Sequence, residues 1–290
     1  DAAPGFFTDK HVAIFGLGLM GASLASALKG KCSLLTGIDP NPRVVETALD
    51  LQMVNQAATH VGTLLNQVDL VILAAPVGSI LNLLAKLPEI CPGAPVVLDI
   101  GSTKVEICKA MQYLPKRFDP IGGHPMCGKE TAGLENADPD IFTNAVFALV
   151  PLERTTQKAR LTAQALATII GSSPIWLDAE SHDQQVAATS HLPYLAANAL
   201  AYCTPLDTAA LAASGFASTT RLAVTSPEMM LDVLQTNRNV ILHSLQTYRD
   251  HLAVIQNALN ENDFSKLQAL LNQGSDARTN IMKANTGETL

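Results

Sequence analysis

The stretch HVAIFGLGLMGASLA, residues 11–25, determines the fold of the first half of the chain. Residues 11–15 are apolar almost throughout, as in a strand that is buried on both faces of a sheet. Gly16, Gly18 and Gly21 then form a Gly-x-Gly-x-x-Gly motif, and helix-forming residues follow from 19 to 29. A strand, a glycine-rich turn and a helix in this order predict a unit that binds a dinucleotide.

Each part of this motif has a physical role in holding a pyrophosphate. Gly16 permits a tight turn, Gly18 lets the backbone approach the pyrophosphate, and Gly21 lets the helix pack closely against the strand. The helix begins with Leu19 and Met20, where free N–H groups and the helix dipole favour an anion. We therefore predict that these five residues bind the pyrophosphate of the cofactor.

Asp39 indicates which dinucleotide the unit prefers. It ends the next predicted strand and lies 18 residues after Gly21, close to the usual spacing of about 20. Its carboxylate can accept hydrogen bonds from ribose hydroxyls and would repel a 2′-phosphate, so NAD is favoured over NADP. Arg43 is near enough to keep NADP open as the less favoured cofactor. The alternative interpretation is a glycine turn followed by an aspartate that only caps a helix.

Strands and helices alternate through the first 177 residues, which predicts a Rossmann-type α/β domain with a mostly parallel sheet. Further strands are predicted at residues 33–38, 69–74, 95–100, 145–150 and 174–177, with helices at 42–51, 77–87, 103–113 and 156–170. After residue 178 only helical patterns appear, at 181–202, 227–260 and 264–273. We predict a dinucleotide-binding domain at 1–177 and an all-α domain for substrate binding and dimerisation at 178–290.

Composition excludes several classes of partner. The net charge is −7 and no block of lysine or arginine occurs, so neither nucleic acid nor an anionic membrane is an expected partner. No apolar run reaches the roughly 18 residues that a membrane span needs. The chain has five cysteines, an odd number, and no Cys-x-x-Cys pair, which argues against a disulfide framework and a structural zinc. We therefore expect the protein to be located in the reducing cytoplasm.

Polar groups follow several predicted strands, at the sheet edge where ligands bind in such folds. Ala75 and Pro76 follow the third strand and are expected to line the nicotinamide side of the cofactor. Ser102 follows the fourth strand, where its hydroxyl can cap the next helix or bind a substrate hydroxyl. Both roles stay open for Ser102 on the sequence alone.

His124 lies in the segment IGGHPMCGKE, residues 121–130, whose glycines and proline predict a rigid loop. Histidine titrates near neutrality, so a histidine held in such a loop is a candidate for proton transfer. A metal site at His124 and Cys127 is disfavoured because no further ligands follow at a recognisable spacing. We predict that His124 is the general base of an oxidoreductase.

Five motifs in order resemble the prephenate/arogenate dehydrogenase family of tyrosine biosynthesis. They stand at residues 16–25, 101–104, 122–128, 190–193 (Ser-His-Leu-Pro) and 214–221 (ending Thr-Arg). The resemblance implies oxidative decarboxylation of a cyclohexadienol with NAD⁺. It also implies a homodimer formed through the helical domain.

The resemblance assigns roles residue by residue. His124 would accept the proton of the substrate 4-hydroxyl, and Ser102 would orient that hydroxyl. Arg221 would bind a substrate carboxylate, while His191 and Glu130 would line the pocket. The alternatives are a surface arginine, a histidine packed in the core and a solvated loop acid. Arg221 also stands out from the residues themselves, because it follows a Ser/Gly/Thr-rich turn, whereas Arg238 and Arg249 fall in a long helical stretch.

One departure from the family pattern bears on the substrate. Many members carry a second histidine three residues after the one at position 191, but this chain has Tyr194 there. Tyr194 is expected to face the substrate side chain, so the choice between prephenate and arogenate stays open. One alternative function is a β-hydroxyacid dehydrogenase. Enzymes of that class resemble each other in placing a catalytic lysine in the helical domain, and this chain has no lysine between residues 171 and 265, so the alternative is disfavoured. Another is a non-catalytic NAD-binding sensor, which would leave the segment at His124 without a purpose.

Overall fold

The computed structural model describes residues 5–129 and 131–286. The chain forms two compact units, one ending at Val240 and the other starting at Ile241. The first unit holds the sheet and the helices α1 to α9, and the second holds most of α10 and all of α11. None of the described helices is both long and apolar enough to cross a membrane.

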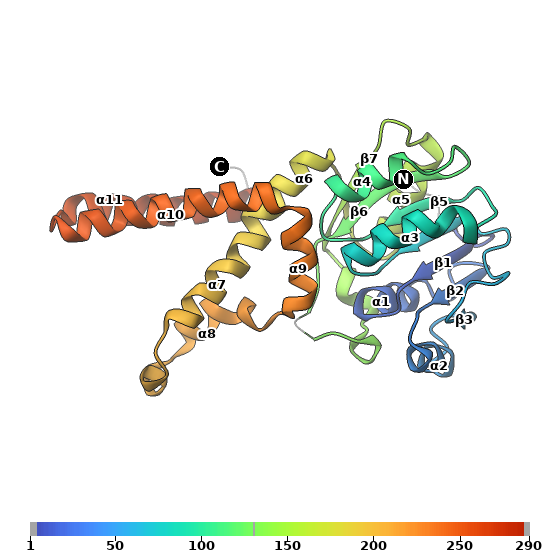
Figure 1. The fold of residues 1–290 in the computed structure, drawn as a ribbon, viewed down its shortest axis with the longest axis horizontal. Coiled ribbons are helices and arrows are strands. Elements are labelled where there is room, and N and C mark those ends of the chain that lie inside the picture. Colours follow the sequence, from blue (N-terminus) through green and yellow to red (C-terminus); the bar gives the residue numbers. More distant parts are fainter. Residues whose placement is uncertain (1–4, 130, 287–290) are drawn as a thin grey trace. The chain divides into compact units, whose positions relative to one another are not determined.

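An eight-stranded sheet forms the centre of the first unit (Figure 1). Its order is β3-β2-β1-β4-β5-β6-β7-β8, and every neighbouring pair is parallel except β6 with β7. The strand order reverses between β1 and β4, which opens a crevice at their carboxyl ends. This arrangement confirms the predicted fold class. The strands are β1 His11–Phe15, β2 Leu34–Ile38, β3 Gln56–Ala58, β4 Leu70–Leu73, β5 Val96–Asp99, β6 Asp119–Pro125, β7 Val146–Pro151 and β8 Ser173–Trp176.

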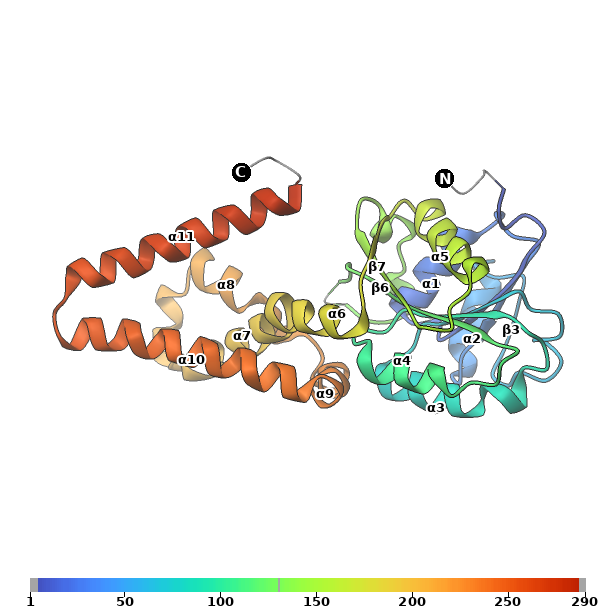
Figure 2. The ribbon, with the colours of Figure 1, turned by 90° about the horizontal axis from the view of Figure 1, so that it is seen from above.

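Helices cover both faces of the sheet (Figure 2), which explains why β1 is apolar throughout. Val12 and Ile14 belong to the core that α1 and α5 cover. Ala13 and Phe15 point the opposite way, into the core that α3 and α4 cover. The helices of this domain are α1 Leu19–Leu28, α2 Pro42–Asp50, α3 Val77–Ile90, α4 Val105–Gln112 and α5 Gln157–Ile169.

The strand β6 differs from the predicted rigid loop at 121–130. Residues 119–125 pair with β5 on one side and β7 on the other, so His124 stands near the end of a strand. Gly123 is needed in this strand because a Cβ there would lie 2.9 Å from both the Asp99 carbonyl oxygen and the Phe147 ring. Glycine here therefore permits close packing inside the sheet and does not end the strand.

The chain is helical after the last strand, as predicted, but with more breaks. The stretch predicted at 181–202 becomes α6 Ala179–Val186, a π-helical turn Ala187–His191 and α7 Leu192–Cys203. Pro193 follows this wide turn and has no N–H to complete a regular helix. The remaining elements of the first unit are η4 Leu206–Leu211, α8 Ser214–Thr220, η5 Arg221–Val224 and α9 Pro227–Thr236.

The predicted helix at 227–260 is interrupted at Asn237, which ends α9. The next helix, α10, runs over Arg238–Asn260, and α11 runs over Phe264–Thr286. In the second unit these two helices form a hairpin whose arms diverge (Figure 2). Large apolar side chains stay exposed on both arms, among them Leu252, Leu259, Phe264, Leu271 and Ile281.

Candidate active site

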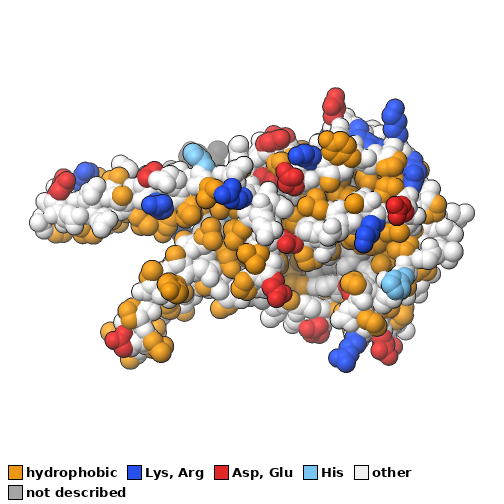
Figure 3. Space-filling view, in the orientation of Figure 1, with side chains coloured by type: hydrophobic (Ala, Val, Ile, Leu, Met, Phe, Trp, Pro, Cys, Tyr) orange, Lys and Arg blue, Asp and Glu red, His pale blue; other side chains and the backbone are white. Residues whose placement is uncertain are grey.

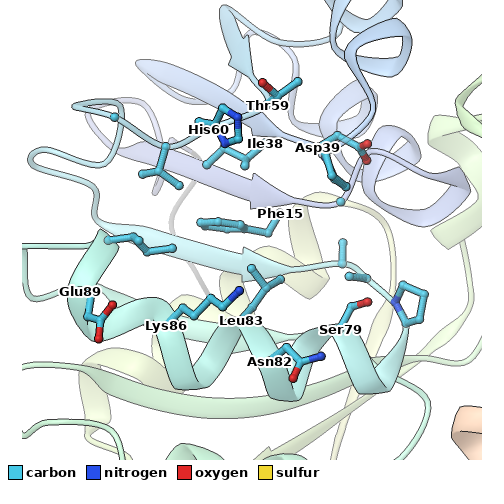
Figure 4. A pocket seen from close by; sticks show the side chains of 18 of the residues that line it. Phe15, Ile38, Asp39, Thr59, His60, Ser79, Asn82, Leu83, Lys86 and Glu89 are labelled. Atoms are coloured by element: carbon cyan, nitrogen blue, oxygen red, sulfur yellow. The ribbon is translucent and has the colours of Figure 1, made fainter.

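A cleft of about 1080 Å³ lies at the carboxyl ends of β1, β2 and β4 (Figure 4). Five of the predicted cofactor residues line it: Gly16, Gly18, Asp39, Ala75 and Pro76. The structure thus brings together the glycine turn, the acid after β2 and the turn after β4. The cleft lies where the strand order reverses, as in other dinucleotide-binding sheets.

The glycine turn fits a bound pyrophosphate. Gly16 has φ +90°, which disfavours a side chain, and a Cβ on Gly21 would lie 1.8 Å from the Gly16 carbonyl oxygen. A Cβ on Gly18 would meet nothing within 4 Å, so this face of the turn is open. No described side chain caps α1, and its first turn has no acid, so the N–H groups of Leu19 and Met20 can meet an anion.

Asp39 is oriented toward the cleft by two backbone hydrogen bonds. Its carboxylate accepts from the Leu17 N–H and the Asn41 N–H, both at 2.9 Å. Each oxygen keeps a second lone pair for a ribose hydroxyl. The helix-capping alternative for Asp39 is wrong, because α2 is capped by the Asn41 side chain, which accepts from the Arg43 N–H at 3.0 Å.

The cleft also contains residues that the sequence analysis did not single out. Thr59 and His60 follow β3, a strand of three half-buried residues that was not predicted. Asn82 and Lys86 of α3 also line the cleft (Figure 4). The signal for the α3 residues was present, since polar residues recur at helical spacing on this otherwise apolar helix.

His124 stands at the carboxyl end of β6, two strands along from β4 at the same edge of the sheet, and does not line this cleft. Its Nδ1 lies 2.9 Å from Nε2 of His182, and Nδ1 of His182 lies 2.8 Å from Oδ1 of Asp183. Neither partner was predicted from the sequence, although His182 and Asp183 stand together shortly after the helix-capping Asp178. A chain of three side chains therefore leads from His124 into the helical region.

These bonds fix where the protons are when both histidines are neutral. The Asp183 carboxylate only accepts, so His182 donates from Nδ1 and its Nε2 is left as an acceptor. His124 then donates from Nδ1, and its own Nε2 carries a free lone pair. That Nε2 has no partner among the described residues, and the half-buried His124 side chain keeps some exposure. Nε2 of His124 is thus held as a hydrogen-bond acceptor.

The surroundings of His124 keep its imidazole uncharged. Burial lowers its pKa well below the ordinary value for histidine, and the positive charges that His182 and Lys104 carry when protonated add to this effect. Lys104 is fully buried and ion-paired with Asp99, which is also fully buried. Asp99 accepts from the Gly101 N–H at 3.0 Å and so ties the loop after β5 to this pair.

Ser102 lies half-buried in that loop, at the carboxyl end of the strand beside β6. The capping alternative for Ser102 is wrong, because α4 begins at Val105 with Lys104 as its N-cap. The carboxylate of Asp183 caps this helix, accepting from the Lys104 N–H at 2.7 Å and the Val105 N–H at 2.9 Å. Because that position is filled, the Ser102 hydroxyl is available for another partner.

The predicted substrate residues fall in the helical part of the first unit. His191 ends the π-helical turn and is buried, and Tyr194 is buried against Met230 and Val233 of α9. Arg221 is exposed at the start of η5, a turn that packs against α7. The packing of Tyr194 does not test its predicted contact with the substrate. Glu130 lies outside the described residues.

A dinucleotide cleft and a neutral imidazole acceptor at one sheet edge define the class of nicotinamide-dependent dehydrogenases. The family model for the prephenate dehydrogenase nucleotide-binding domain matches residues 24–173, and the one for the prephenate dehydrogenase dimerization domain matches residues 178–273. The chain belongs to the prephenate dehydrogenase family, and it is an NAD-dependent dehydrogenase.

Individual relatives agree over nearly the whole chain. Prephenate dehydrogenase of Bacillus subtilis is 29% identical over 283 residues, covering 93% of this chain and 76% of the relative. The structure of Aquifex aeolicus prephenate dehydrogenase with hydroxyphenyl propionate and NAD⁺ superposes with a TM-score of 0.86 at 25% identity, covering 94% of this chain and 98% of that one. Synechocystis arogenate dehydrogenase gives a TM-score of 0.81 at 30% identity, covering 93% and 99%.

Proposed function

We propose that the protein oxidises and decarboxylates prephenate or arogenate, forming 4-hydroxyphenylpyruvate or tyrosine for tyrosine biosynthesis. The observation that carries this proposal is the imidazole of His124, which presents an unprotonated Nε2 at the sheet edge that also holds the cofactor cleft. Relatives named for prephenate and for arogenate support the same reaction. They do not favour either alternative, the β-hydroxyacid dehydrogenase or the NAD-binding sensor.

Bound NAD⁺ supplies the hydride acceptor for C4 of the substrate. The glycine turn and the N-terminus of α1 would hold its pyrophosphate, Asp39 its adenosine ribose, and Ala75 and Pro76 would line its nicotinamide side. An uncharged 2′-hydroxyl suits the carboxylate of Asp39 better than a 2′-phosphate does. This preference supports NAD over NADP.

His124 would take the proton of the substrate 4-hydroxyl as hydride leaves C4. Loss of hydride from a carbon bearing a hydroxyl turns that hydroxyl into a protonated carbonyl, which is a strong acid. A weak base therefore suffices, and a histidine with a lowered pKa stays unprotonated and ready at neutral pH. Ser102 would orient the hydroxyl toward Nε2 of His124.

His182 and Asp183 would stabilise His124 after it takes the proton. The imidazolium so formed keeps its Nδ1–H bond to His182, whose own Nδ1–H faces the Asp183 carboxylate. Carbon dioxide would then leave from C1, because the bonding electrons move into the ring as it becomes aromatic and turn the carbonyl into a phenolate. His124 would return its proton to that oxygen, which gives the phenol and the neutral imidazole. Arg221 would bind a substrate carboxylate, with His191, Tyr194 and Glu130 around the substrate.

The functional unit in this proposal is a homodimer. Residues 178–273 match a dimerization domain, and exposed apolar side chains such as Tyr202, Leu206 and Leu211 lie on and beside α7 (Figure 3). Sedimentation of the purified protein tests the dimer, and a monomer at micromolar concentration would contradict it.

The cysteines bear on the compartment of the protein. All five are free in the described chain, which supports a reducing compartment such as the cytoplasm.

The variant His124→Asn tests the proposed reaction. Both substrates are assayed by NADH formation, with NAD⁺ and NADP⁺ in turn, and loss of the base should lower kcat by about 10²–10⁴. His251→Asn is the matched control, since His251 is an exposed histidine on α10. Turnover of neither substrate by the native protein, or a change below threefold in His124→Asn, would overturn the proposal.

A further inference from the structure

Asn237, which the reaction described above does not use, joins the π-helical turn to α6. It ends α9 and is only 4% exposed. Its Nδ2 donates to the Asp183 carbonyl oxygen at 2.8 Å and lies 3.3 Å from Nδ1 of His191. A carbonyl oxygen can only accept, so the amide must turn its NH₂ group toward Asp183, and this choice fixes the side chain's orientation.

The second hydrogen of that NH₂ group determines the tautomer of His191. It points to Nδ1 of His191, so Nδ1 must be bare and accept. A neutral imidazole with a bare Nδ1 carries its proton on Nε2. Burial is the main cause that lowers the pKa of His191 to about 4, so the ring is neutral at physiological pH.

The Nε2–H of His191 reaches accessible space although the residue is only 2% exposed. Nε2 has no hydrogen-bond partner in the described chain, whereas every fully buried side-chain nitrogen or oxygen of that chain has one. Nε2 therefore cannot be fully buried. Hydrogen bonds connect His191 to His124, because Asn237 links His191 to Asp183, and the Asp183 carboxylate binds the His182 that holds His124.

We propose that Asn237 is a positioning residue that holds His191 as a neutral Nε2–H donor, beside a His124 held as an acceptor. This proposal rests on the proposed function for its substrate. The substrate group that meets His191 is then a hydrogen-bond acceptor, such as a carboxylate or ketone oxygen, because an ammonium group has no lone pair to accept from Nε2–H and would find none on it. The two histidines thus have opposite polarity toward the substrate.

Nitrogen-15 NMR of the histidine rings tests the tautomer directly, without substrate or turnover. At pH 7 the native protein should show Nε2 of His191 protonated and Nδ1 bare, and Asn237→Leu should give a mixture of both tautomers. Asn198→Leu is the matched control, because Asn198 also donates from Nδ2 to a backbone carbonyl, that of Tyr194, at 3.0 Å. A protonated Nδ1 in the native protein would overturn the proposal.

Kinetics then test whether Asn237 acts through His191. Loss of one neutral hydrogen bond predicts that Asn237→Leu raises the KM for the substrate turned over, prephenate or arogenate, by about 2- to 12-fold, with kcat less affected. His191→Phe should raise KM by roughly 10- to 150-fold if the bound oxygen is charged. In the His191→Phe background, Asn237→Leu should change KM by less than twofold, and a persisting effect would overturn the positioning role. An enzyme that turns over neither substrate but keeps the NMR result would contradict only the proposed reaction.

Discussion

Replacing His182 with leucine removes the side chain that accepts a hydrogen bond from His124. The leucine side chain is of similar size and apolar, so it leaves the Nδ1–H of His124 without the acceptor that now lies 2.9 Å away. The Asp183 carboxylate loses its 2.8 Å contact with His182 but keeps the two N–H groups at the start of α4. We therefore expect the variant to fold and to lose activity.

The size of the loss follows from what the hydrogen bond does in each state. If the two tautomers of His124 were equally populated, half of the molecules would lack the acceptor on Nε2, and kcat would fall only about twofold. The larger loss comes after proton transfer. A positive charge on His182 would oppose the imidazolium of His124, but a neutral His182 accepts its Nδ1–H, and bonds to charged groups contribute about 1.5–3 kcal/mol. We expect kcat to fall about 10- to 150-fold, with KM within threefold of the native value.

His182→Gln provides the matched comparison. Its amide oxygen can accept from Nδ1 of His124, as Nε2 of His182 does, but it cannot pass the bond on to Asp183 with imidazole geometry. We expect an intermediate loss of less than tenfold. The assay is steady-state NADH formation, with circular dichroism and Tm to establish folding. A folded His182→Leu enzyme with kcat within threefold of native would refute the role given to His182.

Two further predictions concern acid stability and the cofactor. His191 is neutral when folded, with a pKa of about 4, but has an ordinary pKa near 6.5 when unfolded, so the unfolded state binds protons that the folded state excludes. The free energy of unfolding therefore falls as pH drops from about 6.5 toward 4, and this residue alone accounts for about 2 kcal/mol at pH 5. The His191→Gln variant should show a smaller shift in the urea midpoint between pH 7 and pH 5 than the native protein. Equal shifts in both proteins would contradict the buried neutral state of His191. Asp39→Ala removes the ribose acceptor and its bonds to the Leu17 and Asn41 N–H groups, so the KM for NAD⁺ should rise about tenfold or more while the ratio of NADP⁺ to NAD⁺ activity increases; an unchanged ratio would show that Asp39 does not select the cofactor.

The cofactor half of the site was predictable from sequence because its geometry is local. Gly16 to Gly21 form one continuous turn, and Asp39 follows at a fixed distance along a βαβ unit, so spacing alone indicates the shape. The strand containing His124 was harder to predict. Its two glycines are typical of a turn, and only the tight packing of Gly123 against β5 and Phe147 shows why a strand needs them.

The support for His124 was not predictable because its partners are distant in sequence. His182 lies 58 residues after His124, and Asn237 lies 46 residues after His191. No periodicity links such positions, and each residue read alone has an ordinary interpretation as a polar helix residue. Even the cap of α4 comes from Asp183, 79 residues after Lys104, so the usual search for a capping residue just before the helix fails there.

Asp183 explains why the two histidines can be held in opposite senses. Its carboxylate accepts from His182 and from the first N–H groups of α4, and this makes His124 an acceptor. Its carbonyl oxygen accepts from Asn237, and this makes His191 a donor. A buried carboxylate that also caps a helix cannot turn away without leaving two N–H groups unpaired, so the fold itself maintains both tautomers. In the proposed site, the polarity toward the substrate is therefore set by the same bonds that attach α6 to the start of α4.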